Sequence, residues 1–126
     1  MISKNRLAVV RKLAMALPNV EESTAYGASA FKLHGQLLTC EAINKSAEPE
    51  TLAVRIAIEQ RGELLEAEPD IYYVTDHYVD YPCVLVRLPR IHRDALRDLL
   101  GMAHAFVSAR ATRRRRPRKR GRGRKA

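Results

Sequence analysis

The last fourteen residues of this 126-residue chain constrain its fold, because they cannot belong to a hydrophobic core. Residues 113–126 contain ten Lys or Arg, three Gly or Pro, and no Asp or Glu. Like charges at this density repel one another in any compact form, so we predict a disordered tail over residues 113–126. Removing these ten positive charges from the formal net charge of +9 leaves residues 1–112 at −1. The basic character therefore belongs to the tail.

Residues 1–112 have the length of one compact domain. A chain of this size buries somewhat over about 60% of the surface that it exposes when unfolded, and it is too short for two domains. Charged residues interrupt each apolar run before the roughly 20 residues needed to cross a bilayer, so we expect no membrane partner. The N-terminal stretch mixes Arg and Lys with its apolar residues and is not typical of a secretory signal. We predict a cytoplasmic protein, with the nucleoid as an alternative location inside the cell.

The hydrophobic periodicity of residues 1–112 predicts three helices and five strands. Helices are predicted over residues 4–17, 59–67 and 91–107. Strands are predicted over residues 29–33, 37–43, 51–58, 71–74 and 82–88. The resulting order of elements does not supply the repeated crossovers of a parallel α/β fold. We therefore expect an α+β fold with a largely antiparallel five-stranded sheet and the helices packed on one face.

Four short motifs occur in an order that resembles a known family of small bacterial proteins. They are Leu17-Pro18, Val20-Glu21-Glu22, Phe31-Lys32 and His77-Tyr78. Their order, and the stretches around them over about residues 4–109, resemble the MmcQ/YjbR family. The resemblance implies a CyaY-like α+β fold and DNA binding through a double-wing arrangement of hairpins. The chain has Thr75-Asp76 where members of this family often have Asn-Lys.

The tail predicts contact with a polyanion. Each phosphate that the tail neutralises releases counterions, which gives affinity without sequence preference. We expect DNA as the partner more than RNA. The residues expected to contact nucleic acid in the tail are Arg113, Arg114, Arg115, Arg116, Arg118, Lys119, Arg120, Arg122, Arg124 and Lys125. The Gly-Arg-Gly-Arg segment also resembles arginine- and glycine-rich segments that bind RNA.

A second predicted contact surface is the sheet face opposite the helices. Strand alternation places Lys32, Arg55 and Arg87 on this face. The same alternation adds Thr39, Glu41 and one of Tyr72 or Tyr73. The cations could pair with phosphates while a base stacks on the tyrosine ring. The simpler interpretation is that these are solvated side chains on an exposed sheet face.

The loop "TDHYVDYP" is the densest cluster of polar and aromatic residues in the chain. His77 lies between two carboxylates, Asp76 and Asp80, but no Ser or Cys stands beside it in a nucleophile motif. We interpret His77 and Tyr78 mainly as residues that hold the loop, and also as candidate contacts for nucleic acid. The alternative is a small-molecule or catalytic site near His77, Tyr78 and Tyr81.

Cofactor and metal sites are not predicted. The four histidines are scattered, and Cys40 and Cys83 lack the short paired spacings of zinc ligands. Both cysteines are expected to be reduced core thiols. No phosphate-binding glycine-rich loop is present. The sequence thus predicts a non-enzymatic nucleic-acid-binding protein that takes affinity from its tail and any selectivity from its domain. An RNA- or ribosome-associated interaction module is a further alternative.

Overall fold

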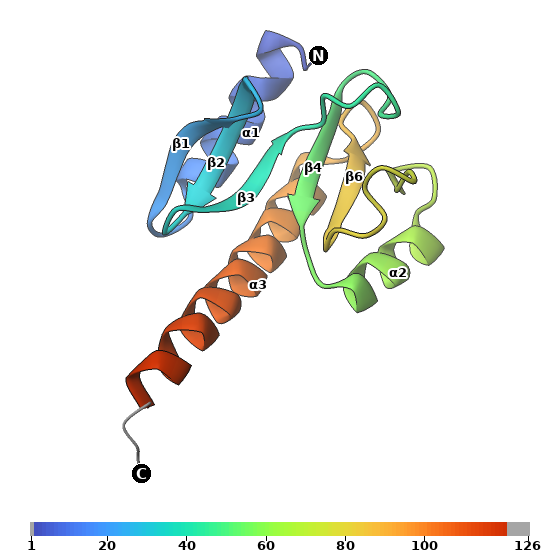
Figure 1. Ribbon diagram of the computed structural model, residues 1–126. Helices are drawn as coiled ribbons and strands as arrows, with labels where there is room; N and C mark the ends of the chain where they lie inside the picture. The colour runs from blue at the N-terminus through green and yellow to red at the C-terminus, as the bar shows by residue number, and fades with distance from the viewer. Residues whose placement is uncertain (1, 121–126) are drawn as a thin grey trace.

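The computed structural model describes residues 2–120, and describes side chains for residues 2–110. Three helices and six strands follow one another along the chain (Figure 1). In chain order they are α1 (Lys4–Met15), β1 (Val20–Ala25), β2 (Ala28–Leu33), β3 (Gln36–Glu41), β4 (Thr51–Arg55), α2 (Ile58–Ala67), β5 (Tyr72–Tyr73), β6 (Cys83–Arg87) and α3 (Arg93–Arg120). The α+β class expected from the sequence is confirmed.

The six strands form one antiparallel sheet in the order β1-β2-β3-β4-β6-β5. The expectation of five strands was wrong because β1 was missed. This strand lies at an edge and pairs with β2 over its whole length, but Val20 is its one buried residue. Because only one residue of β1 is buried, its sequence shows no alternation of apolar and polar residues.

Two tight turns connect β1, β2 and β3. Tyr26 and Gly27 have φ angles of 55° and 79°, and His34 and Gly35 have φ angles of 51° and 78°. Positive φ at both central residues is the geometry of a type I′ hairpin turn, which matches the twist of the flanking strands. The hairpin predicted at residues 34–36 is therefore present, and a second one precedes it. Tyr26 is 86% exposed at the tip of that second hairpin.

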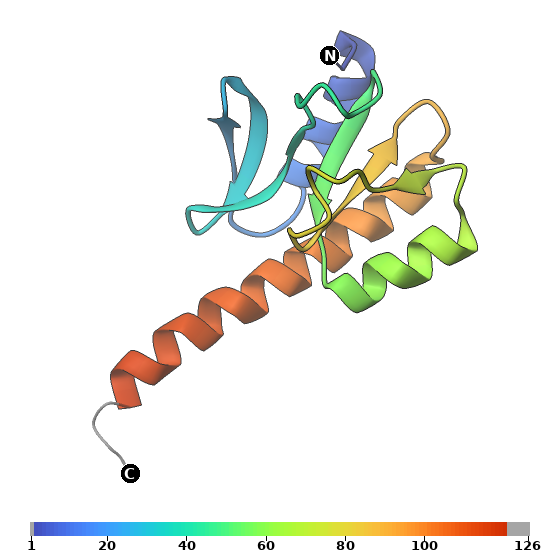
Figure 2. The same ribbon diagram turned by 45° about the vertical axis from the view of Figure 1, so that its right-hand side comes forward.

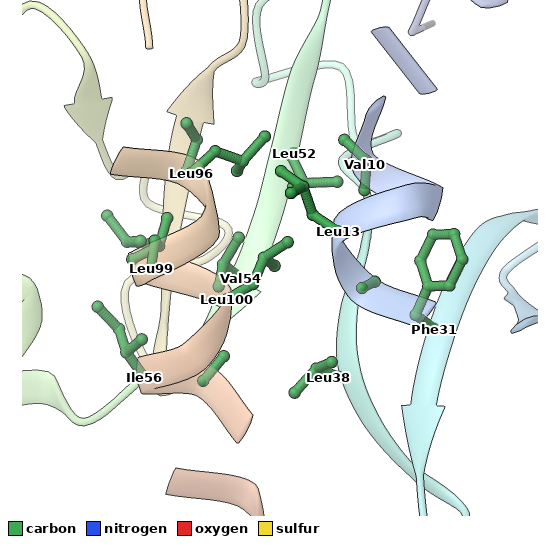
Figure 3. Close-up of a cluster of buried hydrophobic side chains, with 14 of the residues drawn as sticks. Val10, Leu13, Phe31, Leu38, Leu52, Val54, Ile56, Leu96, Leu99 and Leu100 are labelled. Atoms are coloured by element: carbon green, nitrogen blue, oxygen red, sulfur yellow. The ribbon is translucent and has the colours of Figure 1, made fainter. Parts of the chain in front are cut away.

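The main hydrophobic core lies between one face of the sheet and the helices. Phe31, Leu38 and Leu52 project from the sheet toward Val10 of α1 and Leu100 of α3 (Figure 3). Two leucines of α2, at positions 64 and 65, pack against the edge of the same core. All three helices therefore contribute to one face, as the sequence predicted.

The N-terminal end is fixed by two carboxylates that lie far along the chain. Ser3 caps α1 by accepting a hydrogen bond from the Arg6 amide. Glu41 of β3, which is buried, accepts the amide of Ile2 at 2.7 Å. Glu50 accepts the Ser3 amide at 2.9 Å and pairs with Arg6 at 3.1 Å. These contacts hold the start of α1 against the β3–β4 end of the sheet.

The helix α3 begins within the core and ends outside it. Among its residues with described side chains, 93–110, the last buried apolar one is Val107, and Figures 1 and 2 show the second half of the helix projecting away from the sheet. The helix continues to Arg120, so the boundary expected after residue 112 is not marked by a break in the helix. Ala and Arg are good helix formers, which favours this continuation. The disorder predicted for the free tail stays a prediction, and its residues 121–126 lie outside the described residues.

Candidate nucleic-acid interface

The sheet face opposite the helices is not the open platform that strand alternation suggested. A second cluster of buried residues occupies it: Ala30, Cys40, Ala53 and Leu85. Tyr73 and Tyr78 pack against this cluster together with the small side chains of the β3–β4 loop. Figure 2 shows the segment between β5 and β6 lying in front of β4. Two loops, residues 42–50 and 74–82, therefore cover much of the face.

Arg87, a predicted phosphate contact, is engaged within the protein. Its guanidinium lies 4.3 Å from the centre of the Tyr73 ring and pairs with Glu48 at 2.8 Å. It also donates to the carbonyl oxygens of Pro69 and Asp70. The hydrogen bond to Glu48 raises the pKa of Arg87, and the same bond lowers the pKa of Glu48. Arg87 thus joins the β3–β4 loop to the turn before β5.

The two loops over the sheet are held by tyrosine hydroxyls. The Tyr73 hydroxyl accepts the Glu48 amide at 2.8 Å and shares a 2.7 Å hydrogen bond with Thr51. The Tyr78 hydroxyl accepts the Asn44 amide at 3.3 Å. Burial raises the pKa of Tyr78, so its phenol is held in the neutral form. Of the two tyrosines weighed for this face, Tyr73 lies on it, whereas Tyr72 belongs to the helix-facing core.

The structure places His77 at the outer side of this loop assembly. Its ring meets the Tyr78 ring edge-on, with 4.8 Å between centroids. Tyr78 is therefore turned inward to the loop contacts, while His77 is exposed and Tyr81 is 57% exposed. Tyr78 thus contacts the β3–β4 loop, whereas the loop-holding role of His77 stays a prediction.

Arg61 is the buried cation that the sequence did not reveal. It lies on α2, is 7% exposed, and donates to the carbonyl oxygens of Val79, Tyr81 and Cys83 at 3.0, 2.9 and 3.2 Å. These three bonds fix the course of the loop into β6. An Arg within "EQRGELLEA" reads as a solvated helix residue, so no local signal identifies this role.

Lys32 and Arg55 are the other two cations predicted on the sheet. Lys32 lies opposite Glu21 of β1 and Leu37 of β3, and it is half-buried. Arg55, at the end of β4, donates to the Leu37 carbonyl oxygen at 3.5 Å and lies 5.7 Å from the centre of the Phe106 ring on α3. Arg55 is thus placed beside the helix that leads into the cationic tail.

Thr39 and Glu41 do not accompany these cations on the outer face, contrary to expectation. The register shifts between Phe31 and Lys32, so Thr39 pairs with Val54 of the core and is fully buried. Glu41 pairs with Leu52 on the same helix-facing side. This shift in register interrupts the simple alternation on which the expectation rested.

Both cysteines are free and buried, as predicted. Burial, with a smaller effect of Cys83, raises the pKa of the Cys40 thiol from 9.0 to about 11. Burial also raises the pKa of Cys83, partly offset by Arg61. Neither thiol is activated as a nucleophile at neutral pH, since the thiolate is the reactive form.

The Cys40 thiol is expected to weaken the fold at alkaline pH. The pKa of the Cys40 thiol is higher in the folded chain than in the unfolded chain. The contribution of this thiol to the free energy of unfolding is therefore fully present below pH 9 and is lost as pH rises toward 11. Between about pH 8 and about pH 10.5 this loss is about 2 kcal/mol. Urea unfolding of the wild type and of Cys40→Ala at both pH values measures it. An equal pH dependence in the two proteins contradicts the prediction, because all other titrating groups are shared.

Across residues 2–120, no helix is long and apolar enough to cross a membrane. Within the same range, no three His, Cys, Asp or Glu side chains gather in a group that could hold a metal ion.

The architecture of this chain is also found in a solved structure. The fold is similar to that of the Deinococcus radiodurans protein DR2400. The crystal structure of DR2400, described as a DUF419 domain, has a TM-score of 0.67 and 20% sequence identity to this chain. The match covers 81% of this chain and 78% of DR2400. No family model and no curated protein matches the chain. The likeness supports the fold, and the resemblance to the MmcQ/YjbR family stays a prediction.

Proposed function

We propose that this protein is a non-enzymatic nucleic-acid-binding protein whose affinity comes mainly from residues 113–126. The observation that carries the proposal is the separation of charge along the chain. Ten Lys or Arg and no acid occupy these fourteen residues, while residues 1–112 sum to −1. A cationic segment of this density attracts phosphate backbones by Coulomb forces and by release of their counterions.

The position of α3 supports the same proposal. The helix leaves the sheet after Val107, so the cationic segment begins outside the core (Figure 1). Of the residues that follow, positions 108–110 have described side chains, and none of these three belongs to the hydrophobic core. The segment is therefore available to a polyanion without any rearrangement of the domain. Duplex DNA is the partner that we propose, with RNA as the alternative.

The contacts of the loop at His77 favour a structural role over a catalytic one. Tyr78 is tied to the β3–β4 loop, and the carbonyl oxygens of Val79 and Tyr81 are bound by Arg61. Neither buried thiol has the lowered pKa that nucleophilic catalysis needs. These observations favour binding over catalysis. We propose that any selectivity comes from the exposed hairpin tips and loops of the domain.

A chain ending at Thr112 tests the proposal. Within residues 2–110 the last buried core residue is Val107, so this shorter chain is expected to fold like the full chain. Loss of all ten charges is expected to lower affinity for duplex DNA by a factor of at least about 100 in dilute buffer. Fluorescence anisotropy with labelled duplex DNA and single-stranded RNA measures both chains, and thermal melting confirms that both are folded.

Two results would speak against the proposal. Equal affinity of the two chains would show that the cationic segment is irrelevant. Failure of the full chain to retain DNA or RNA in dilute buffer would turn attention to His77. The alternative is then a small-molecule or catalytic site near His77, Tyr78 and Tyr81, and His77→Ala should abolish its activity.

A further inference from the structure

The strand β1 forms one edge of the sheet and presents a regular row of backbone groups there. It pairs with β2 along all six of its residues, from Val20 to Ala25, without a shift in register. Figures 1 and 2 both show β1 as the outermost strand, with no other helix or strand of the described chain beyond it. Its sequence contains no Pro and no Lys, two residues by which proteins protect an exposed edge from pairing with another chain. This edge is therefore open to a further strand.

The turn after β1 determines which of its backbone groups point outward. The two-residue type I′ turn is closed by Ala25 and Ala28, which form a hydrogen-bonded pair in the geometry of such a turn. Hydrogen-bonded and non-hydrogen-bonded pairs alternate along an antiparallel ladder, so the amide and carbonyl groups of Glu22 and Thr24 point away from β2. Among the backbone hydrogen bonds that residues 2–120 form outside their helices and strands, none involves Glu22 or Thr24.

The two carboxylates of β1 do not guard this edge, because each has a cation close by in the same chain. Glu22 lies on the helix-facing side and pairs with Arg11 of α1 at 3.0 Å. Glu21 lies on the other side of the strand, directly opposite Lys32 of β2. Opposite charges at facing positions of two strands attract each other. The edge therefore carries little net charge toward a neighbouring strand.

This edge is complementary to a second copy of itself. A twofold axis perpendicular to the sheet at Ser23 places Glu22 of one protomer opposite Thr24 of its partner, and the reverse. Glu22 and Thr24 are the residues whose backbone groups point outward, so each of these pairs exchanges both backbone hydrogen bonds. The Glu22 carboxylate then faces a hydroxyl group, which can donate a hydrogen bond to it. The neighbouring twofold register, centred on Glu22, would instead place two carboxylates directly opposite each other, which is destabilising.

We propose that this protein forms a homodimer by antiparallel pairing of two β1 strands about Ser23. The two six-stranded sheets then join into one continuous sheet, with the helices of both protomers on the same face. The interface uses the same surface of both protomers, and the opposite edge of each sheet is the two-residue strand β5, so the assembly closes at two chains. The dimer carries two cationic segments, which can act together on one polyanion.

A cysteine at the twofold axis tests the register. In a non-hydrogen-bonded antiparallel pair the two Cα atoms lie about 4.5 Å apart, within the range of about 4.4–6.8 Å that a disulfide spans. Ser23→Cys in the full chain is therefore expected to form an intermolecular disulfide almost completely when it is oxidised with diamide. Thr24→Cys is the matched control on the same strand, because its counterpart in the partner lies two positions out of register and beyond the reach of a disulfide. Non-reducing electrophoresis measures both variants, and the wild type gives the background from the buried Cys40 and Cys83.

A proline tests whether the outward backbone groups form the interface. Thr24→Pro removes an amide that points away from β2, a position at which an edge strand tolerates proline, so the protomer is expected to stay folded. Thr24→Val keeps this amide and is the control. Sedimentation equilibrium at about 1 M salt compares them with the wild type, because a Debye length of about 3 Å suppresses association through the cationic segments. The wild type and Thr24→Val are expected at twice the mass of one chain, and Thr24→Pro at the mass of one chain.

Thermal melting verifies that each variant is folded at the assay temperature. A wild type that sediments as a monomer at every concentration tested would overturn the dimer. Equal cross-linking of Ser23→Cys and Thr24→Cys, or an unchanged mass of folded Thr24→Pro, would overturn it as well. These assays contain no nucleic acid, so they test the dimer separately from the proposed function. Absence of DNA binding by the wild type would overturn the proposed function and leave the dimer intact.

Discussion

Replacing Arg61 by methionine is expected to lower the free energy of unfolding by about 3–4 kcal/mol. The side chain is 7% exposed and supplies donors to three carbonyl oxygens of the loop into β6. Methionine fits a similar volume but donates nothing, so the carbonyl oxygens of Val79, Tyr81 and Cys83 lose these partners. Each such loss costs about 1–3 kcal/mol where water cannot replace the donor. Urea unfolding at neutral pH measures the change.

Glu63→Met is the matched control, because Glu63 lies on the same helix and is exposed. A surface substitution of this kind is expected to change stability by less than about 0.5 kcal/mol. Loss of the Arg61 contacts should also release the loop that carries His77. Faster amide hydrogen exchange across residues 77–83 in Arg61→Met would report that release. A stability loss no larger than that of Glu63→Met would refute the role assigned to Arg61.

The parts of the fold that were predictable from sequence are those with strong apolar periodicity. The buried positions of α3 recur at helical spacing through Leu96, Leu99, Leu100, Ala103 and Val107, and the alternation in β4 and β6 places their apolar residues correctly. The edge strand β1 carries no such pattern. Its only local signal is the Tyr26-Gly27 turn, which becomes informative once β2 is available as a partner. Edge strands are therefore where counting apolar residues is least useful.

The outer face of the sheet was harder to predict, because its state depends on contacts between distant residues. Glu41, which was predicted on this face, lies on the helix-facing side and accepts the amide of Ile2, 39 positions away. Arg87 reaches Glu48 across the same separation. Alternation assigns a side chain to a face, but it does not show whether a loop covers that face. Of the cations predicted on this face, Arg55 lies beside the helix that leads into the cationic segment, where its guanidinium contacts the Phe106 ring of α3.

The affinity for duplex DNA is expected to fall by a factor of about 10³–10⁵ between about 50 and about 200 mM salt, the largest effect predicted for this protein. The reason is that each phosphate contact adds about 0.9 to the magnitude of the slope of log affinity against log salt, so ten contacts would give about −9. Single-stranded RNA would give about −7 for the same number of contacts.

The size of the slope is also expected to follow the number of charges in the segment. Replacing five of the ten Lys and Arg in residues 113–126 by Gln should roughly halve it, whichever five are chosen, because the attraction is to the backbone and not to bases. Two different sets of five, compared by anisotropy across one salt series, separate charge number from position. Unequal slopes for the two sets would mean that particular residues of the segment form specific contacts, and a slope near zero in the wild type would mean that Coulomb attraction does not carry the binding.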